Sequence, residues 1–263
     1  TGLDRMVLQE GMKQFAGQAE KPVAFRGHTR EDSIAGREGV GNLSVAVVSD
    51  LQSWINEYLA YLIAELVETG NFVRWVHHVK ELTDEDVVFY LGCGQMVPKS
   101  ILGRHTHNLV VHESALPHGR GWSPLTWQIL EGKDEIPVTL FEAQEQVDSG
   151  PVYLQRIMRF RGDELLGELR EKQAAFTVGM CIDFLKDYPQ VVSLARKQEG
   201  GPTWYPKRSP SDSRIDPRKS ITEQFNLLRV VDNNRYPAWF ELNGETYVLK
   251  IEKKRTCHSR SSR

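Results

Sequence analysis

Short apolar runs alternate with amphipathic stretches from residue 43 onward. Leu43 to Val48 is an apolar, β-branched run, which is typical of a buried parallel strand. The next stretch repeats aromatic residues and leucine at helical spacing, begins near Ser53 and ends at Thr69-Gly70. Three further apolar runs predict strands at residues 72–76, 87–91 and 109–111. This alternation predicts an α/β domain with a mostly parallel sheet.

Helix and turn signals organise the second half of the chain. Ser123-Pro124 predicts a helix start, with Ser123 as the N-cap and proline in the first turn. Apolar runs at residues 138–141 and 152–157 predict a strand pair around a turn that contains Asp148-Ser149-Gly150. A long helix is expected from Asp163 to about Asp187, followed by Pro189.

The glycine-rich stretch Gly200-Gly201-Pro202 predicts a domain boundary. Beyond it we expect one helix at residues 220–231 and two strands joined at Asn243-Gly244, a strong hairpin signal. Residues 1–41 show scattered glycine and charge without a sustained period. The expected organisation is therefore an N-terminal extension of unknown role (1–41), the main α/β domain (42–200), a small α+β domain (201–252) and a basic tail (253–263).

Composition narrows the class of protein. Of the 263 residues, 40% are hydrophobic and 26% charged, which is enough for a packed core and argues against wholesale disorder. The net charge of −2 argues against a general nucleic-acid binder. From Gly200 onward, 13 Lys and Arg face 7 Asp and Glu, but five of these basic residues lie in the tail, which we interpret as a solvated segment.

Cysteine usage and hydropathy indicate the compartment. The three cysteines, Cys93, Cys181 and Cys257, form no CxxC pair and are odd in number, which favours a reducing environment over a disulfide framework. No run approaches the roughly 18 apolar residues of a membrane span, and the N-terminal stretch lacks the apolar region of a signal peptide. The expectation is a cytoplasmic protein with no membrane partner.

Two residues carry candidate acid–base chemistry. His112 lies at the carboxyl end of an apolar strand, where open α/β sheets bind their ligands. A histidine there can act as a general base near neutral pH. Asp148 lies in a turn between strands, from which its carboxylate could orient that histidine. Taken singly, each residue also has a structural interpretation, as a strand-end side chain or a turn former.

Three segments taken together resemble the folate-dependent N-formyltransferase family. They are HESALP at His112 to Pro117 with a Ser-Pro helix start after it, VDSG at Val147 to Gly150, and QMVPKSIL at Gln95 to Leu102. The run from Trp204 to Arg208 and its continuation to Ala238 also look like the segment that follows the catalytic domain in sugar and tRNA members. The similarity extends over roughly residues 43 to 252.

The resemblance implies a Rossmann-like catalytic domain over residues 42–200 that transfers a formyl group from 10-formyltetrahydrofolate, its co-substrate, to an amine. His112 would remove the amine proton, and Asp148 would hold the imidazole. No metal is implied. The residues that would contact the folate are Met96, Val97, Pro98, Ser114, Ala115, Leu116, Pro117 and Val147.

One position departs from the family pattern. The family places an asparagine two residues before the histidine, and this chain has Val110 there. The nearest asparagine, Asn108, lies about 13 Å along a strand from His112, unless a bulge shortens the path. Asn108 is therefore a catalytic candidate with a structural alternative as a strand residue. Its absence from the site would leave oxyanion stabilisation to another donor, such as a backbone N–H or His118.

Other motifs have simpler interpretations. Arg120, between two glycines, could meet a substrate phosphate or brace its loop. The pairs His105/His107 and His77/His78 lack cysteine or clear carboxylate partners nearby, so we expect surface residues and no metal site. Gly92-Cys93-Gly94 lacks the later glycine and helix start of a dinucleotide loop.

We infer the acceptor amine from the family resemblance and from two features of other family members that this sequence lacks. The first strand runs into Ser49 to Gln52 without the glycine-rich phosphate loop of glycinamide ribonucleotide members. The segment after Gly200 is short and nearly neutral, unlike the basic domain of methionyl-tRNA members. We therefore expect a nucleotide-linked amino sugar as substrate, with tRNA less favoured and a homodimer as a further expectation. Two alternatives stay open, a hydrolase of 10-formyltetrahydrofolate and a non-catalytic folate-binding domain.

Overall fold

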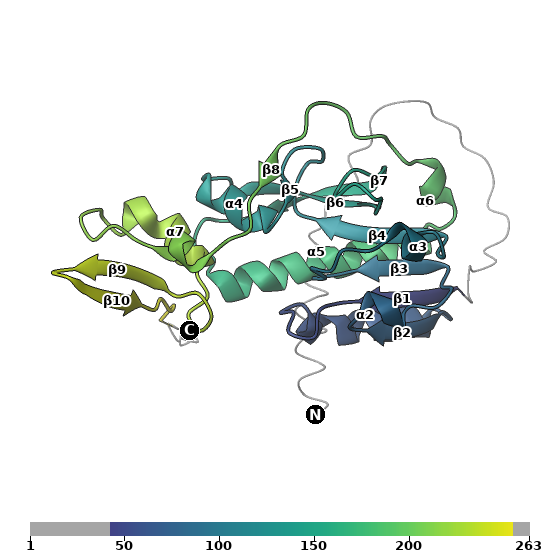
Figure 1. Cartoon of the computed structure of the whole chain (residues 1–263), viewed down its shortest axis with the longest axis horizontal. Helices are drawn as coiled ribbons and strands as arrows, with labels where there is room; N and C mark the ends of the chain where they lie inside the picture. The colour runs from purple at the N-terminus through teal and green to yellow at the C-terminus, as the bar shows by residue number, and fades with distance from the viewer. Residues whose placement is uncertain (1–42, 255–263) are drawn as a thin grey trace, which may run out of the picture.

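The computed structural model describes residues 43–254, and a six-stranded sheet forms its centre (Figure 1). The strand order is β2-β1-β3-β4-β6-β7, in which the first four strands are parallel and β6 and β7 are each antiparallel to their predecessor. The strands span Ser44–Val48 (β1), Phe72–Val76 (β2), Val87–Tyr90 (β3), His107–His112 (β4), Glu135–Glu142 (β6) and Val152–Arg159 (β7). The predicted α/β architecture with a mostly parallel sheet is confirmed.

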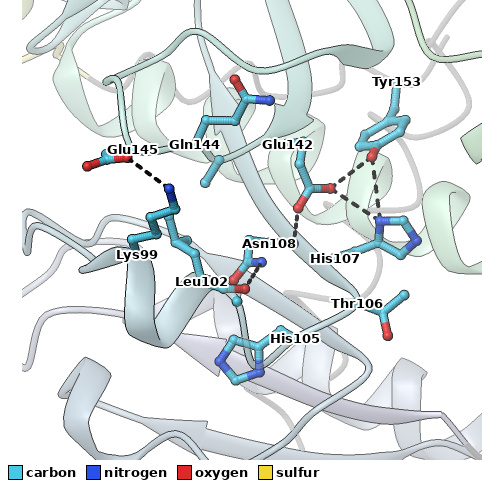
Figure 2. Close-up of a pocket in the computed structure, with 12 residues that line it drawn as sticks. Lys99, Leu102, His105, Thr106, His107, Asn108, Glu142, Gln144, Glu145 and Tyr153 are labelled. Carbon is cyan, nitrogen blue, oxygen red and sulfur yellow. Dashed lines mark hydrogen bonds and ion pairs between the residues drawn. The ribbon is translucent and has the colours of Figure 1, made fainter.

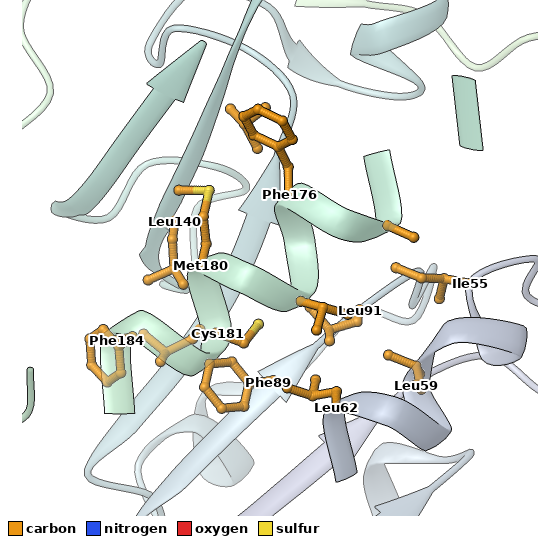
Figure 3. Packing of buried hydrophobic residues seen from close by; sticks show 14 of the residues in the cluster. Ile55, Leu59, Leu62, Phe89, Leu91, Leu140, Phe176, Met180, Cys181 and Phe184 are labelled. Atoms are coloured by element: carbon orange, nitrogen blue, oxygen red, sulfur yellow. The ribbon is translucent and has the colours of Figure 1, made fainter. Parts of the chain in front are cut away.

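Helices α2 (Asn56–Glu68) and α5 (Leu166–Lys186) cover one face of this sheet. Leu59, Leu62 and Leu66 recur along one side of α2 and are buried. The helical spacing predicted the positions of Leu62 and Leu66, whereas the aromatic residues of the same stretch, Tyr58 and Tyr61, are half-buried. Figure 3 shows Leu59 and Leu62 on the side of α2 that faces Phe89. The Phe89 ring contacts that of Phe184 on α5 edge-on, with 6.4 Å between ring centroids. This is the main hydrophobic core of the described residues.

The opposite face of the sheet carries the site. A smaller apolar cluster that includes Val79 of η1 (Val79–Glu81) lies there, and Val97 and Ile101, the latter from α3 (Lys99–Leu102), pack against it. Side chains alternate along a strand, so positions 108, 110 and 112 of β4 share this face. His112 therefore emerges on the α3 side of the sheet, away from the main core.

The remaining elements are short. They are β5 (Arg120–Gly121), α4 (Pro124–Leu130), α6 (Gln190–Ser193), β8 (Trp204–Tyr205), η2 (Pro210–Ser213), η3 (Thr222–Gln224), α7 (Phe225–Val230), β9 (Ala238–Leu242) and β10 (Glu245–Leu249). Strands β9 and β10 form an antiparallel hairpin, in which Asn243 and Gly244 both have positive φ, at 54° and 84°. The hairpin predicted from Asn243-Gly244 is thus confirmed.

Some local predictions were wrong. Ser123 does precede α4, but its φ of 48° is left-handed and its side chain makes no capping hydrogen bond. The helix expected at residues 220–231 is shorter, because a 3-10 turn, η3, precedes α7. Helix α5 begins at Leu166 and not at Asp163, because Glu164 accepts hydrogen bonds from the backbone of the preceding turn. The predicted extension, residues 1–41, and most of the basic tail lie outside the described residues.

A buried ion pair attaches the C-terminal elements to the sheet domain. Arg229 of α7 is 1% exposed and donates from Nε to the Glu164 backbone oxygen and from Nη2 to the Glu164 carboxylate, both at 3.0 Å. On the rim, Arg170 pairs with Asp232 at 3.1 Å. These contacts fix α7 beside the start of α5. None of the helices in residues 43–254 is long and apolar enough to span a membrane.

Candidate active site

His112 is the last residue of β4 and is 7% exposed. Its Nε2 lies 2.8 Å from the backbone oxygen of Gly119. A carbonyl oxygen can only accept, so Nε2 carries the proton in this contact and the neutral ring keeps its lone pair on Nδ1. The edge of the ring also contacts Phe141, with 6.5 Å between centroids. The strand and the loop after it thus fix both the tautomer and the orientation of His112.

Asp148 reaches the same ring from the connection between β6 and β7. One of its carboxylate oxygens, Oδ2, lies 3.9 Å from His112 Nε2 and accepts a hydrogen bond from the Gly121 backbone N–H at 2.9 Å. The backbone of Asp148 has a φ of 52°, a left-handed conformation that aspartate tolerates better than most residues. The structure therefore brings together the two residues that the sequence singled out.

Gly150 allows the turn to lie close to β6. A Cβ atom at this position would stand 1.8 Å from the Glu142 backbone oxygen, so any side chain would collide with the backbone. The glycine of the VDSG motif is needed for a close backbone approach. That approach places Asp148 beside the end of β4.

A segment far away in sequence holds the loop after His112. Strand β5 pairs in parallel with β8, and Thr203 accepts from the backbone of Arg120 through its carbonyl and from the backbone of Gly119 through Oγ1. A Cβ atom on Gly121 would lie 2.5 Å from the Tyr205 backbone oxygen. This pairing was not predicted, since a two-residue strand has no periodic signal in the sequence.

Arg120 is buried in this arrangement, at 6% exposed. Its Nη2 donates to Gln198 Oε1 at 2.6 Å, and its Cζ lies 5.8 Å from the centre of the Trp204 ring. Nε is buried without a hydrogen-bond partner. This geometry favours the bracing interpretation of Arg120, and contact with a substrate phosphate stays a prediction.

Asn108 lies at the other end of β4 from His112. Its amide is occupied at both ends, because Nδ2 donates to the Leu102 backbone oxygen at 3.0 Å and Oδ1 accepts from Tyr90 OH at 3.1 Å. The pairing of β4 with β3 and β6 keeps a regular register, so no bulge shortens the distance to His112. These contacts favour the structural interpretation of Asn108.

Val110 occupies the family's asparagine position on the same face as His112. It is half-buried and packs against an apolar cluster of Leu116, Phe141 and Val152. A valine side chain offers no donor to a developing oxyanion. Any donor at the reacting carbonyl must therefore come from another group.

The predicted folate-contacting residues differ in exposure. Met96 is 71% exposed and Val147 39% exposed, whereas Ser114, Leu116 and Pro117 are buried and Ala115 is half-buried. Val97 packs against the smaller apolar cluster, and Pro98 caps α3. Gln95 anchors the loop, since its Nε2 donates to Asp50 Oδ1 and to the His77 backbone oxygen, both at 2.9 Å. Met96 and Val147 are thus the exposed apolar side chains of this predicted set, and their contact with folate stays a prediction.

A cavity of about 460 Å³ adjoins the loop that leads to Asp148 (Figure 2). Glu142, Ala143, Gln144 and Glu145 line one side, and α3 lines the other. Lys99 Nζ lies 3.7 Å from Glu145 Oε2, and Figure 2 shows this pair facing each other across the space. None of the predicted folate-contacting residues lines this cavity. Two lining residues lie close to them in the chain, because Lys99 follows Pro98 and Glu145 lies two residues before Val147.

Glu142 organises the polar end of that cavity. Its Oε2 accepts from Tyr153 OH at 2.8 Å and lies 3.2 Å from His107 Nδ1 (Figure 2). Burial raises the pKa of the Tyr153 hydroxyl, and the neighbouring Glu142 carboxylate adds to the shift. The phenol therefore remains a hydrogen-bond donor across the physiological pH range.

A second cavity, of about 290 Å³, lies on the other side of the His112 strand, between α4, α5 and the C-terminal elements. Glu113 lines it and accepts from Gln173 Nε2 at 2.7 Å. Burial raises the pKa of this carboxyl group above its usual range. Glu113, the residue directly after His112, thus lines this second cavity, whereas His112 lies beside Gly119 and Asp148.

The histidine pairs correct one expectation. His105 and His107 are buried, each 8% exposed, and not on the surface as predicted. His105 lies 3.5 Å from Glu85, where burial lowers its pKa, and His107 lies against Glu142. Within residues 43–254 no group of three or more metal-ligating side chains is present.

A known protein family matches the part of the chain that contains His112 and Asp148. Residues 67–183 match the family model described as formyl transferase. The methionyl-tRNA formyltransferase of Cutibacterium acnes is 29% identical over 167 residues, which cover 63% of this chain and 53% of that protein. The chain thus spans about half the length of the curated relatives it matches.

Solved structures share the fold. Methionyl-tRNA formyltransferase from Clostridium thermocellum superposes with a TM-score of 0.66 at 19% identity, covering 81% of this chain and 94% of that chain. A likely sugar N-formyltransferase from Mycobacterium tuberculosis gives 0.61 at 17% identity, covering 81% and 100%. HypX from Aquifex aeolicus, in complex with tetrahydrofolic acid, gives 0.60 at 19% identity, covering 80% and 37%.

Proposed function

We propose that this chain transfers a formyl group from 10-formyltetrahydrofolate to the amine of a nucleotide-linked amino sugar. The match of residues 67–183 to the formyl transferase family model supports the class of reaction. The observation that carries the proposal is the meeting of His112 and Asp148, 3.9 Å apart, at the end of β4. The two residues come from the two motifs that resemble the family's catalytic motifs.

The arrangement suits acyl transfer to an amine. An amine that attacks the formyl carbon must lose a proton, and His112 has a ring lone pair to accept it while Nε2 stays bonded to Gly119. The nearby carboxylate of Asp148 stabilises the imidazolium that results. The proton can then pass to the departing folate nitrogen. A positioned base of this kind contributes about 10²–10⁴ in rate.

The surroundings fit the folate co-substrate. A pterin is a flat, partly apolar ring, and the apolar side chains of Met96 and of Val147, the residue before Asp148, are exposed and available to such a ring. The cavity of about 460 Å³ is lined in part by residues 142–145, on the connection that leads to Asp148. The solved HypX structure, which shares the fold, is described in complex with tetrahydrofolic acid.

Two observations favour a nucleotide carrier for the amine. Trp122 is 45% exposed, and Lys207 Nζ stands 4.8 Å from the centre of its ring. An exposed indole with a cation beside it can stack a base and attract a phosphate. A solved neighbour is described as a sugar N-formyltransferase and has nearly the length of the described fold.

Methionyl-tRNA is the second candidate acceptor. The curated relatives that match this chain are methionyl-tRNA formyltransferases, although they are matched over about half their length. The net charge of −2 makes a polyanionic acceptor less favoured.

One assay separates these candidates. Purified chain is incubated with 10-formyltetrahydrofolate and a panel of acceptors: nucleotide-linked amino sugars, methionyl-tRNA, or no amine. Tetrahydrofolate formation is followed together with the mass of the acceptor. The proposal expects a formylated amino sugar, and expects that His112→Ala abolishes it while the exposed His118→Ala does not.

The other outcomes overturn the proposal in distinguishable ways. Formylation of methionyl-tRNA alone establishes the second candidate. Formate release without any amine identifies a hydrolase. Folate binding without turnover under all conditions identifies a non-catalytic domain.

A further inference from the structure

We propose that Gln198 is a positioning residue for this reaction, whose side-chain amide holds the Asp148 turn against His112 and ties that turn to Arg120. This inference rests on the proposed function. It assigns a role to a segment outside the three motifs, between α6 and β8.

The contacts of Gln198 are specific at both ends of its amide. Nε2 donates to the backbone oxygens of Asp148 and Gly150, both at 2.9 Å. Oε1 accepts from Arg120 Nη2 at 2.6 Å. All of these partners lie at least 48 residues from Gln198 in the chain. One side chain therefore bridges the turn that carries Asp148 and the loop that follows His112.

The chemistry of the partners fixes which way the amide points. An arginine side chain can only donate and a backbone carbonyl can only accept, so the amide oxygen must face Arg120 and the nitrogen must face the turn. Only a side chain with a donor and an acceptor at one end satisfies both. A glutamate would place an oxygen against two carbonyl oxygens.

The Asp148 turn needs such a restraint. Its backbone is in a left-handed conformation with φ at 52°, which a non-glycine residue adopts at some cost in free energy. The carboxylate lies 3.9 Å from His112 and is itself held by the N–H of Gly121. If the turn relaxed, the carboxylate would move away from the imidazole. Displacements of about 1 Å in such positions cost about 10²-fold in rate.

Arg120 fixes the orientation of the Gln198 side-chain amide. The guanidinium is 6% exposed and, in the part of the chain that the structure describes, forms no ion pair with a carboxylate. A buried cation without a counter-charge needs its remaining polar contacts, here the Gln198 oxygen and the face of Trp204. The amide of Gln198 is thus held firmly from the side of Arg120.

The backbone around Gln198 is anchored on both sides. Arg196 exchanges two backbone hydrogen bonds with Val152, at 2.7 and 2.9 Å, and β8 pairs with β5. The segment therefore touches the start of β7 and the loop after His112 at once. Gln198 lies between these two anchored points of the chain. Its side chain can therefore hold the Asp148 turn at a fixed position relative to them.

Two variants of Gln198 test the bridge. Gln198→Met keeps the length but neither donates nor accepts. Gln198→Glu keeps an acceptor for Arg120 and places a second oxygen toward the turn. Both should lower kcat about 10- to 100-fold with little change in KM, because they misplace Asp148 and leave substrate contacts intact. The exposed neighbour provides the control, and Glu199→Gln should leave kcat unchanged.

A double-mutant cycle separates positioning from general structure. In an Asp148→Asn background, Gln198→Met should lower kcat by less than about twofold, since its effect passes through the Asp148 carboxylate. Losses that simply add would overturn the proposal. Unchanged kcat in both single variants would overturn it as well.

Hydrogen exchange gives a readout that needs no acceptor. In Gln198→Met, the backbone amides of residues 146–150 should exchange at least about tenfold faster than in the wild type, while α2 and α5 keep their protection. Unchanged exchange in the turn would overturn the bridge. If the wild type formylates no acceptor but the exchange result holds, the proposed function fails and the bridge stands.

Discussion

His112 Nε2 and Asp148 Oδ2 lie 3.9 Å apart, and each makes a shorter hydrogen bond to the backbone of residues 119–121. His112 donates to the Gly119 carbonyl at 2.8 Å, and Asp148 accepts from the Gly121 N–H at 2.9 Å. The backbone of residues 119–121 therefore sets the relative position of the acid–base pair. The relative position of His112 and Asp148 thus depends on residues 119–121, and pairing with β8 holds those residues.

The first prediction concerns this pair. His112→Ala and Asp148→Ala should each reduce turnover at least about 100-fold, the contribution expected of a positioned general base and the carboxylate that supports it. Single-turnover rates with 10-formyltetrahydrofolate and an acceptor whose free amine the wild type formylates measure the loss. His118→Ala, an exposed change in the same loop, is the matched control. Near-wild-type rates in both variants, with native folding, would contradict the assignment.

The second prediction concerns Asn108 and Val110. Asn108→Ala removes partners from Tyr90 OH and the Leu102 carbonyl, so it should lower the free energy of unfolding by about 1–3 kcal/mol. It should keep at least about a tenth of the activity, a barrier change of no more than about 1.4 kcal/mol. Urea unfolding and kcat on the same preparation measure both quantities.

Val110→Asn provides the complement to that variant. If the site otherwise follows the family, the new amide should be tolerated and raise turnover by donating to the oxyanion. If the donor lies elsewhere, the amide is buried among Leu116, Phe141 and Val152 and costs roughly 1–3 kcal/mol. A severe loss of turnover in Asn108→Ala with intact folate binding would contradict the structural role of Asn108.

The third prediction compares two glycines. Gly150→Ala should destabilise the protein by roughly 3 kcal/mol, the upper end of overpacking costs, because its Cβ would meet the Glu142 carbonyl at 1.8 Å. Gly167→Ala lies in α5 with open space around it and should stabilise by about 0.5–1 kcal/mol. Thermal unfolding of the two variants checks the opposite signs. A Gly150→Ala protein with native stability and turnover would show that the turn can move freely.

The fourth prediction concerns acid stability. Burial alone would raise the pKa of Glu164, but backbone N–H groups of Arg161 and Gly162 bond its carboxylate and hold its pKa below the usual range. A depressed pKa in the folded state stabilises the protein above the unfolded value of about 4.3. This stability is lost as the pH falls through the folded pKa.

The variant Glu164→Gln tests this linkage. At pH 7 it should be less stable than the wild type, because it also leaves the buried Arg229 without its counter-charge. Below about pH 4.3 the difference should shrink, since wild-type Glu164 becomes protonated as well. Denaturant unfolding at several pH values measures the gap, with the exposed Glu199→Gln as control. A gap that is independent of pH would contradict the assignment.

The sequence by itself determined the elements whose signals are local. The run at residues 43–48 is a strand because it is apolar and β-branched, and Asn243-Gly244 is a hairpin because both residues accept positive φ. The motifs around His112 and Asp148 located the candidate pair without any structure. The strand and the hairpin, and each motif taken separately, are defined by residues within about ten positions of one another.

Only the tertiary structure decided how those pieces hold one another. The pairing of β5 with β8, the bridge from Gln198 to the Asp148 turn and the contact of Gln198 with Arg120 join segments 48 to 84 residues apart in the chain. His105 and His107, expected at the surface, are buried for the same reason, since their partners Glu85 and Glu142 come from other parts of the sheet. The periodicity of apolar residues predicts which face of a helix or strand is buried. It does not predict which distant backbone or side-chain groups will form hydrogen bonds with that element. That choice is made when the packed core fixes the distances between loops.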